Sequence, residues 1–234
     1  ASFMIFAWMF LVVISIFIAR YSRSLWKGWT IFGSDAWFQL HRLIMGVAVL
    51  MTIIAIIMIF VDKEGWSESA DDHAIFGIIV LVLAIIQPTI AFFRPHPNTP
   101  RRPIFNWFHR IVALLLVIFV VVAVFKGAEL LEDSGGDSVS KVLIALIVIA
   151  IITALILEYL AFRLKKNRPP ETNITTGEMQ EVKLDGSELF WETKIQRILL
   201  VLFALVVFIL AVVMIARVAG AGSDDDDDDD HDDD

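Results

Sequence analysis

The sequence predicts an all-α integral membrane protein, a bundle of six transmembrane helices, and three observations favour this class. Hydrophobic residues make up 58% of the 234 residues, more than a soluble domain carries, because such a domain must cover its surface with polar groups. Apolar runs long enough to cross a bilayer core of about 30 Å recur along the chain. These runs also lack the polar–apolar alternation at the ten-residue scale that is typical of membrane β-barrels.

Six such runs are bounded by charged residues, proline or glycine. They cover residues 3–20, 36–61, 74–93, 104–125, 142–162 and 195–218. Ser34 and Asp35 directly precede the second run, so we expect them to cap its helix. Four prolines between positions 95 and 103 predict a stiff, extended link between the third and fourth helices.

The charges of the connections predict the orientation. Basic residues gather after the first and third helices, whereas acidic residues gather after the second and fourth. Because Lys and Arg mark cytoplasmic loops, the basic connections should face the cytoplasm and both chain ends should lie outside, in the extracellular or lumenal space. The net charge of −8 owes much to an acidic run at residues 224–234, so it points to no nucleic-acid partner.

The pattern divides the chain into four segments. We expect a five-helix transmembrane core at residues 1–163, a polar cytoplasmic linker at 164–193, a sixth transmembrane helix at 194–218 and an acidic, disordered extracellular tail at 219–234. The chain opens without Met, almost directly on a spanning helix, so we expect it to derive from a longer precursor.

The histidines are the candidate ligands, because the chain contains no cysteine. His41, His73 and His109 fall at helix ends within the membrane, where ionisable groups are costly and usually functional. His41 and His109 share one depth on different helices without a nearby carboxylate, which favours axial ligation of a haem over tetrahedral zinc. His96 lies between prolines and His231 lies in the acidic tail, so both are expected in solvent.

His73 requires a site of its own. At about 1.5 Å per residue, its helix places it about 30 Å from the inner face, too far to serve the same haem. A partner at that outer depth on the first helix would lie at or just before Ala1. Gly46 and Gly77, placed soon after His41 and His73, are small positions that would let a macrocycle lie close to a helix.

Basic residues surround the predicted inner site. Arg42 and Arg110 directly follow two of the histidines and are expected to meet haem propionates. Five further basic residues would create a positive field at the same face. They are Arg23, Lys27, Arg94, Arg101 and Arg102. The alternative, that these five only determine topology, stays open.

A second hypothesis comes from another functional class. The histidines would then be structural or would relay protons in a haem-free membrane scaffold or transporter subunit. A visible spectrum separates the two hypotheses, because reduced haem b held by two histidines gives sharp α and β bands and a scaffold gives none. No catalytic acid or base is predicted under the haem hypothesis, because the redox chemistry belongs to the cofactor.

Several motifs together resemble the cytochrome b561 family. They read FAW at 6–8, LHR at 40–42, HAIFG at 73–77, QP at 87–88, FRP at 93–95 and NWFHR at 106–110. The resemblance covers the first five helices, residues 1–163. It is strongest to the branch of ferric-chelate reductase 1-like proteins, in which the b561 core follows an extracellular DOMON or reeler domain.

The resemblance implies an ascorbate-dependent transmembrane oxidoreductase. Its four-helix core would hold two haems b and pass single electrons from cytoplasmic ascorbate to an outer ferric chelate or monodehydroascorbate. The family pattern assigns His41 and His109 to the inner haem. It assigns His73 to the outer haem, together with a first-helix His about eight residues before Trp8, just ahead of Ala1. The expected setting is the plasma membrane or an endomembrane vesicle, with lipid, an upstream DOMON or reeler domain and a homodimer as partners.

Overall fold

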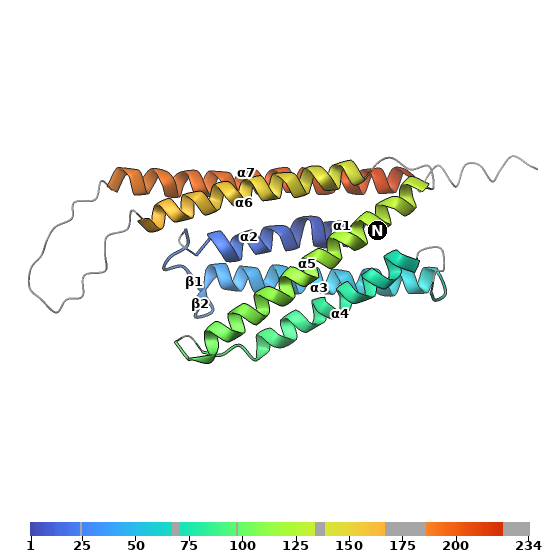
Figure 1. Cartoon of the computed structure of the whole chain (residues 1–234), viewed down its shortest axis with the longest axis horizontal. Coiled ribbons are helices and arrows are strands. Elements are labelled where there is room, and N and C mark those ends of the chain that lie inside the picture. The colour runs from blue at the N-terminus through green and yellow to red at the C-terminus, as the bar shows by residue number, and fades with distance from the viewer. Residues whose placement is uncertain (24, 67–70, 97, 134–138, 167–185, 222–234) are drawn as a thin grey trace, which may run out of the picture.

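The computed structural model describes residues 1–23, 25–66, 71–96, 98–133, 139–166 and 186–221. Six helices are long and apolar enough to cross a membrane, and they run lengthwise beside one another (Figure 1). They cover Ser2–Tyr21, Ala36–Asp62, Asp72–Phe92, Arg101–Glu132, Ser140–Leu164 and Trp191–Gly220. The chain is therefore an all-α, multi-pass integral membrane protein, and the predicted fold class is confirmed.

The first span is not a regular α-helix. It consists of α1 (Ser2–Ile5), a π-helical segment η1 (Phe6–Val12) and α2 (Val13–Tyr21). A π-helix is wound more widely than an α-helix and is rare outside short segments, often at functional sites. The buried residues of η1 include Trp8, which faces the interior of the bundle. The apolar run at residues 3–20 predicted the helix but not this local winding.

A short antiparallel hairpin, β1 (Thr30–Ile31) and β2 (Ser34–Asp35), leads into α3 (Ala36–Asp62). Asp35 takes the N-cap position of α3 as predicted, but its side chain makes no capping hydrogen bond. Ser34 was also expected to cap α3, and it lies in β2 instead. The helix therefore begins directly after β2, without a side-chain cap.

The remaining helices are α4 (Asp71–Phe92), α5 (Arg101–Asp133), α6 (Ser140–Lys166) and α7 (Gly186–Ala221). Arg101 and Arg102 were expected in the preceding loop but belong to the first turn of α5. The helix can include Pro103, because the N–H groups of the first helical turn have no partner within the helix and a proline there removes no hydrogen bond. The sixth helix was expected at 194–218, and α7 extends beyond this range at both ends. Most of the predicted linker (167–185) and most of the predicted tail (222–234) lie outside the described residues.

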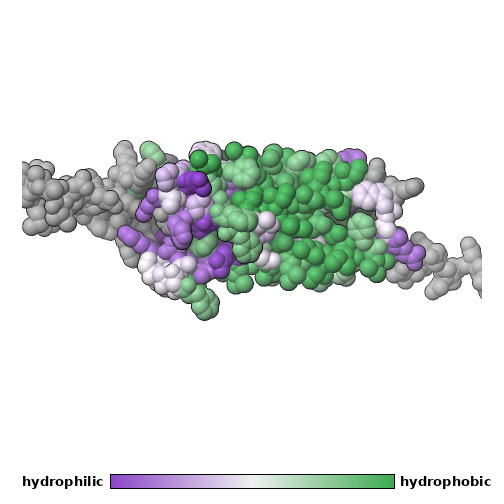
Figure 2. Space-filling view, turned by 90° about the horizontal axis from the view of Figure 1, so that it is seen from below, coloured by the Kyte–Doolittle hydropathy of each residue, from purple (hydrophilic) through white to green (hydrophobic). Residues whose placement is uncertain are grey.

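The helices pack as three pairs. The first span packs on α3, α4 packs on α5, and α6 packs on α7. The α6–α7 pair also lies against the first span, where Phe17 contacts Phe203 with ring centroids 4.2 Å apart. Isoleucine, valine, leucine and phenylalanine side chains cover the outer surface as a broad hydrophobic belt between hydrophilic ends (Figure 2). This belt is the surface that lipid requires.

Polar contacts join three helices at the end of the first span. Nε and Nη2 of Arg20 donate to the two carboxylate oxygens of Glu158 on α6, each at 2.7 Å. The Tyr21 hydroxyl donates to the same carboxylate at 3.1 Å. Nε2 of Gln196, a buried residue of α7, donates to the backbone carbonyl of Tyr21 at 3.1 Å. The first span is therefore held by α6 and α7 as well as by α3.

Candidate haem-binding site

His41 and His109 lie near the beginnings of α3 and α5, at the same end of the bundle. The two helices belong to different packed pairs, because α3 packs on the first span and α5 packs mainly on α4. The structure therefore places the two histidines that were predicted to share one depth at the same end of the bundle.

The surroundings of His41 fix which ring nitrogen carries the proton. Its Nδ1 lies 2.9 Å from the Ser15 hydroxyl and 3.1 Å from the Ser15 backbone carbonyl. A carbonyl oxygen can only accept a hydrogen bond, so Nδ1 carries the proton and donates it. Nε2 then keeps its lone pair, which is the arrangement found in histidines that bind a metal. Ser15, which is fully buried on α2, thus holds the ring of His41 with Nε2 available as a ligand atom.

His109 has a different environment. The Nδ1 atom of its ring is buried and has no hydrogen-bond partner among the described residues, and the same holds for Oε1 of Gln87 on α4. The two residues are in contact, because Nε2 of Gln87 donates to the His109 backbone carbonyl at 3.2 Å. Leaving a buried polar atom without a hydrogen-bond partner is costly.

His73 lies at the opposite end of the bundle, at the beginning of α4. Its Nδ1 lies 2.8 Å from the backbone carbonyl of Ala123 on α5, so Nδ1 is again the donor and Nε2 keeps its lone pair. The ring rests on Gly127, where a Cβ atom would come within 2.9 Å of the His73 Cε1 and 3.0 Å of its Nδ1. Only glycine at this position leaves room for the ring.

The two glycines expected beside the haems have open space next to them. A Cβ atom built on Gly46 or on Gly77 meets no other atom within 4 Å. A planar macrocycle lying against α3 or α4 requires such space. Open space alone does not identify what fills it, so the role of both glycines stays a prediction.

The donor set suits a haem better than a bare metal ion. In the part of the chain that the structure describes, no group of three or more His, Asp or Glu comes together to hold a metal. A haem supplies four nitrogens itself and needs only two axial ligands from the protein. His41 and His109 can provide such a pair, whereas His73 has no second imidazole beside it among the described residues.

Positive charge accumulates at the end that holds His41 and His109. Burial, followed by the charges of Arg102 and Arg23, lowers the pKa of Arg94 from its usual 12.5 to about 10. Burial, followed by the charges of Arg110 and Arg102, likewise lowers the pKa of Arg23. These arginines destabilise one another in the absence of an anion, and an anion bound between them would relieve the repulsion.

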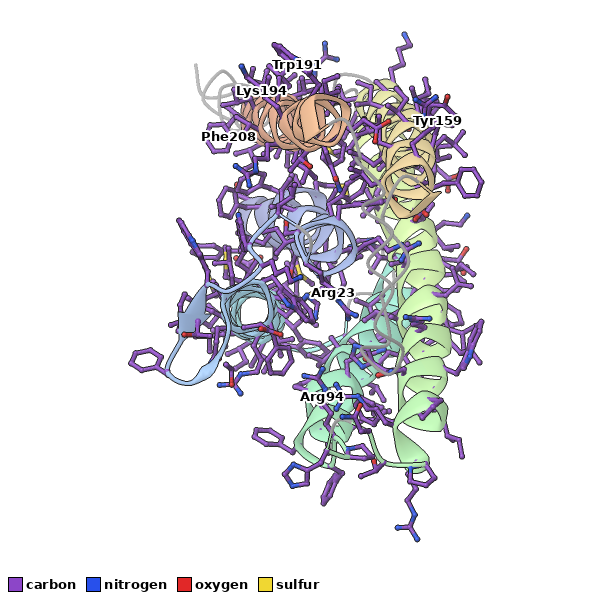
Figure 3. All side chains as sticks on the ribbon, turned by 90° about the vertical axis from the view of Figure 1, so that its left-hand side faces the viewer. Arg23, Arg94, Tyr159, Trp191, Lys194 and Phe208 are labelled. Carbon is purple, nitrogen blue, oxygen red and sulfur yellow. The ribbon has the colours of Figure 1, made fainter. Side chains whose placement is uncertain are left out.

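Aromatic rings hold these arginines in place. The Arg94 guanidinium lies 4.0 Å from the centre of the Phe38 ring, and that of Arg23 lies 4.2 Å from the Trp37 ring. When this end is viewed along the bundle, Arg23 lies between α3 and the α4–α5 pair, and Arg94 lies over α4 (Figure 3). Arg42 also contacts Phe38, at 5.7 Å. Of the other predicted basic residues, Lys27 and Arg101 are exposed.

Six membrane-spanning helices, with two histidines near one end and a third at the other, suit a membrane protein of the haem-binding, electron-carrying class. Residues 1–131 match the family of eukaryotic cytochrome b561, and this match covers more than half of the 234 residues. The chain belongs to the cytochrome b561 family. The resemblance inferred from the motifs is thereby confirmed, and membership implies haem b and transmembrane electron transfer.

Curated relatives agree with this assignment. The chain is 40% identical to human ferric-chelate reductase 1 over 127 residues, which are 54% of this chain and 22% of the relative. It is 37% identical to the mouse ferric-chelate reductase 1 over 164 residues, 70% of this chain and 28% of the relative. An Arabidopsis thaliana protein with cytochrome b561, DM13 and DOMON domains is 29% identical over 183 residues, 75% of this chain and 19% of the relative.

The chain thus spans less than a third of the length of these three relatives. No solved structure matches it. The family match ends at residue 131, so α6 and α7 lie outside the matched segment.

Proposed function

We propose that this chain carries single electrons across the membrane through two haems b, from ascorbate at the basic end to a ferric chelate or monodehydroascorbate at the other. The observation that carries this proposal is the hydrogen bonding of the imidazoles of His41 and His73, which lie at opposite ends of the bundle. In both, Nδ1 donates to a backbone carbonyl, which leaves Nε2 for iron. When bound, haem b supplies the one-electron redox chemistry.

The residues of this chain hold and orient the cofactors. His41 and His109 hold the haem at the basic end, where Ser15 orients the ring of His41 and Gln87 binds the backbone of His109. His73 holds the second haem, and its partner is a histidine at or just before Ala1. Arg42 and Arg110 pair with haem propionates. No proton-transfer residue is needed for an electron to pass between the two sites.

The donor binds where the arginines repel one another. Ascorbate is an anion at neutral pH, and Arg23, Arg94 and Arg102 supply the charge that attracts it. This end faces the cytoplasm by the bias of basic residues, so both chain ends lie outside, in a plasma membrane or an endomembrane vesicle. An upstream DOMON or reeler domain and a second copy of the chain are further partners consistent with the family.

Purified protein in sealed proteoliposomes tests this function. We expect ascorbate supplied on the side of the basic end to reduce the haem, and a ferric chelate on the other side to reoxidise it. Protease accessibility of the basic connections establishes the orientation of the protein in each preparation. Reduction only by ascorbate on the opposite side would overturn the proposed direction, and the absence of α and β bands would favour the scaffold hypothesis.

Replacing Arg94 by glutamine should weaken ascorbate binding. A charge-assisted hydrogen bond contributes about 1.5–3 kcal/mol, so KM for ascorbate should rise by about tenfold or more while the haem content stays constant.

The exposed Arg101 provides the matched control for this measurement. It carries the same charge at the same end of the bundle, but the charges that act most strongly on Arg94 are those of Arg102 and Arg23. Arg101→Gln should change KM only slightly. Equal effects of the two substitutions would mean that general charge, and not the cluster around Arg94, attracts the donor.

A further inference from the structure

The hairpin before α3 has an unusual turn. Thr30 pairs with Asp35 and Ile31 with Ser34, so the turn consists of Phe32 and Gly33. Both have positive φ, 49° for Phe32 and 73° for Gly33. Two-residue turns of this kind favour Asn or Gly at the first position, because a bulky side chain is strained there. The turn itself therefore gives no reason for phenylalanine at position 32.

The apolar side chains of this hairpin are not buried in the protein. Phe32 is 96% exposed, Trp29 is 69% exposed and Ile31 is 45% exposed. The backbone that carries them is nevertheless tied to α3, because the Gln39 Nε2 donates to the Ile31 carbonyl at 3.1 Å and the Ala36 N–H donates to the Trp29 carbonyl at 2.9 Å. The hairpin thus presents three apolar side chains on an ordered support.

The position of the hairpin determines what these side chains meet. It lies at the basic end, beside the start of α3 (Figure 1), and projects sideways from α3, away from the other helices (Figure 3). In Figure 2 this end is the hydrophilic band that borders the hydrophobic belt. An element that projects sideways at this level would meet the headgroup layer of a bilayer that surrounds the belt. Tryptophan and other aromatic residues are favoured in that layer.

We propose that residues 29–33 form a lipid-binding element that inserts Phe32, flanked by Trp29 and Ile31, into the interfacial layer of the membrane. Its ligand is phospholipid. Lys27, which is exposed shortly before the hairpin, adds attraction to anionic headgroups. Insertion compensates for the strained conformation of Phe32, which no contact within the described protein does. The proposal depends only on the membrane-embedded fold and not on the proposed electron transfer.

The absence of cysteine from the sequence makes a site-specific test possible. Phe32→Cys and, separately, Ile31→Cys would be labelled with an environment-sensitive NBD fluorophore, and the protein would be reconstituted into phosphatidylcholine and phosphatidylserine nanodiscs. His96→Cys is the matched control, because His96 is exposed in the connection between α4 and α5 at the same end. We expect blue-shifted emission at positions 31 and 32, and several-fold stronger quenching by lipids brominated on their acyl chains than at position 96.

Two results would overturn the proposal. The first is emission at positions 31 and 32 that is as water-like and as weakly quenched as at position 96. The second is blue-shifted emission that brominated lipid leaves unchanged, which would mean that protein and not lipid covers the hairpin. Because all three positions are exposed, the labels should leave the fold intact, and an unchanged helical circular dichroism spectrum verifies this.

Discussion

Replacing His41 by alanine should lower the haem content of the purified protein by about half, because one of the two proposed haems loses a ligand. His109→Ala should have the same effect, since both rings bind one iron under the proposed assignment. The pyridine haemochrome assay measures this content directly. His96→Ala serves as the control and should keep all of its haem, because His96 is exposed in a loop.

The double substitution of His41 and His109 sharpens this prediction. If the two residues ligate the same haem, removing both should cost no more haem than removing either, because groups that act as a unit are not additive. Full haem content in both single variants would refute the assignment. A further loss in the double variant would mean that each histidine serves a different haem.

Replacing Gly127 by alanine should remove the other haem while leaving the first in place. The new methyl group would lie 2.9 Å from the His73 Cε1, and it is fixed to the backbone of α5, so the ring of His73 must move. That movement breaks the 2.8 Å hydrogen bond to the Ala123 carbonyl and turns Nε2 away. Haem content should fall by about half, and the spectrum should keep only the contribution of the haem at the basic end.

Gly220→Ala is the control for this substitution, because a Cβ atom there meets nothing within 4 Å. Alanine is favoured over glycine within a helix by about 1 kcal/mol, so neither substitution should destabilise the helix itself. Combining Gly127→Ala with His41→Ala should give nearly haem-free protein. If the combination retains as much haem as His41→Ala alone, His73 does not hold a separate haem.

The sequence was sufficient to predict the spans, because length and hydropathy determine which segments can cross a bilayer. It was less informative at their ends. The fourth apolar run stops at residue 125, whereas α5 continues to Asp133. Lys126 lies in this extension, 2.9 Å from Glu129 and 3.4 Å from Asp72 on α4. The apolar run ends before Lys126, although ion pairs on the water side allow the helix to continue.

The histidines could also be found from the sequence, because ionisable residues stand out in an apolar run. The residues that orient them could not. Ser15 and Gly127 are ordinary residues of helices, and each acquires its importance from a histidine far away along the chain. Gln87 was noticed only as part of a family motif. Such roles depend on how the helices pack, and periodicity within one helix carries no information about the neighbour that it meets.

The contact of α7 with the first span reaches the residue that orients His41. Phe17 lies two residues after Ser15 on α2, and it packs on Phe203 of α7. Ser15 in turn directs the ring of His41. A displacement of α7 along its axis would therefore pass through one short stretch of α2 to the ring of His41. Under the proposed assignment, a force applied to the last helix, far from either electron partner, would change how this ring holds the haem iron and with it the ease of its reduction.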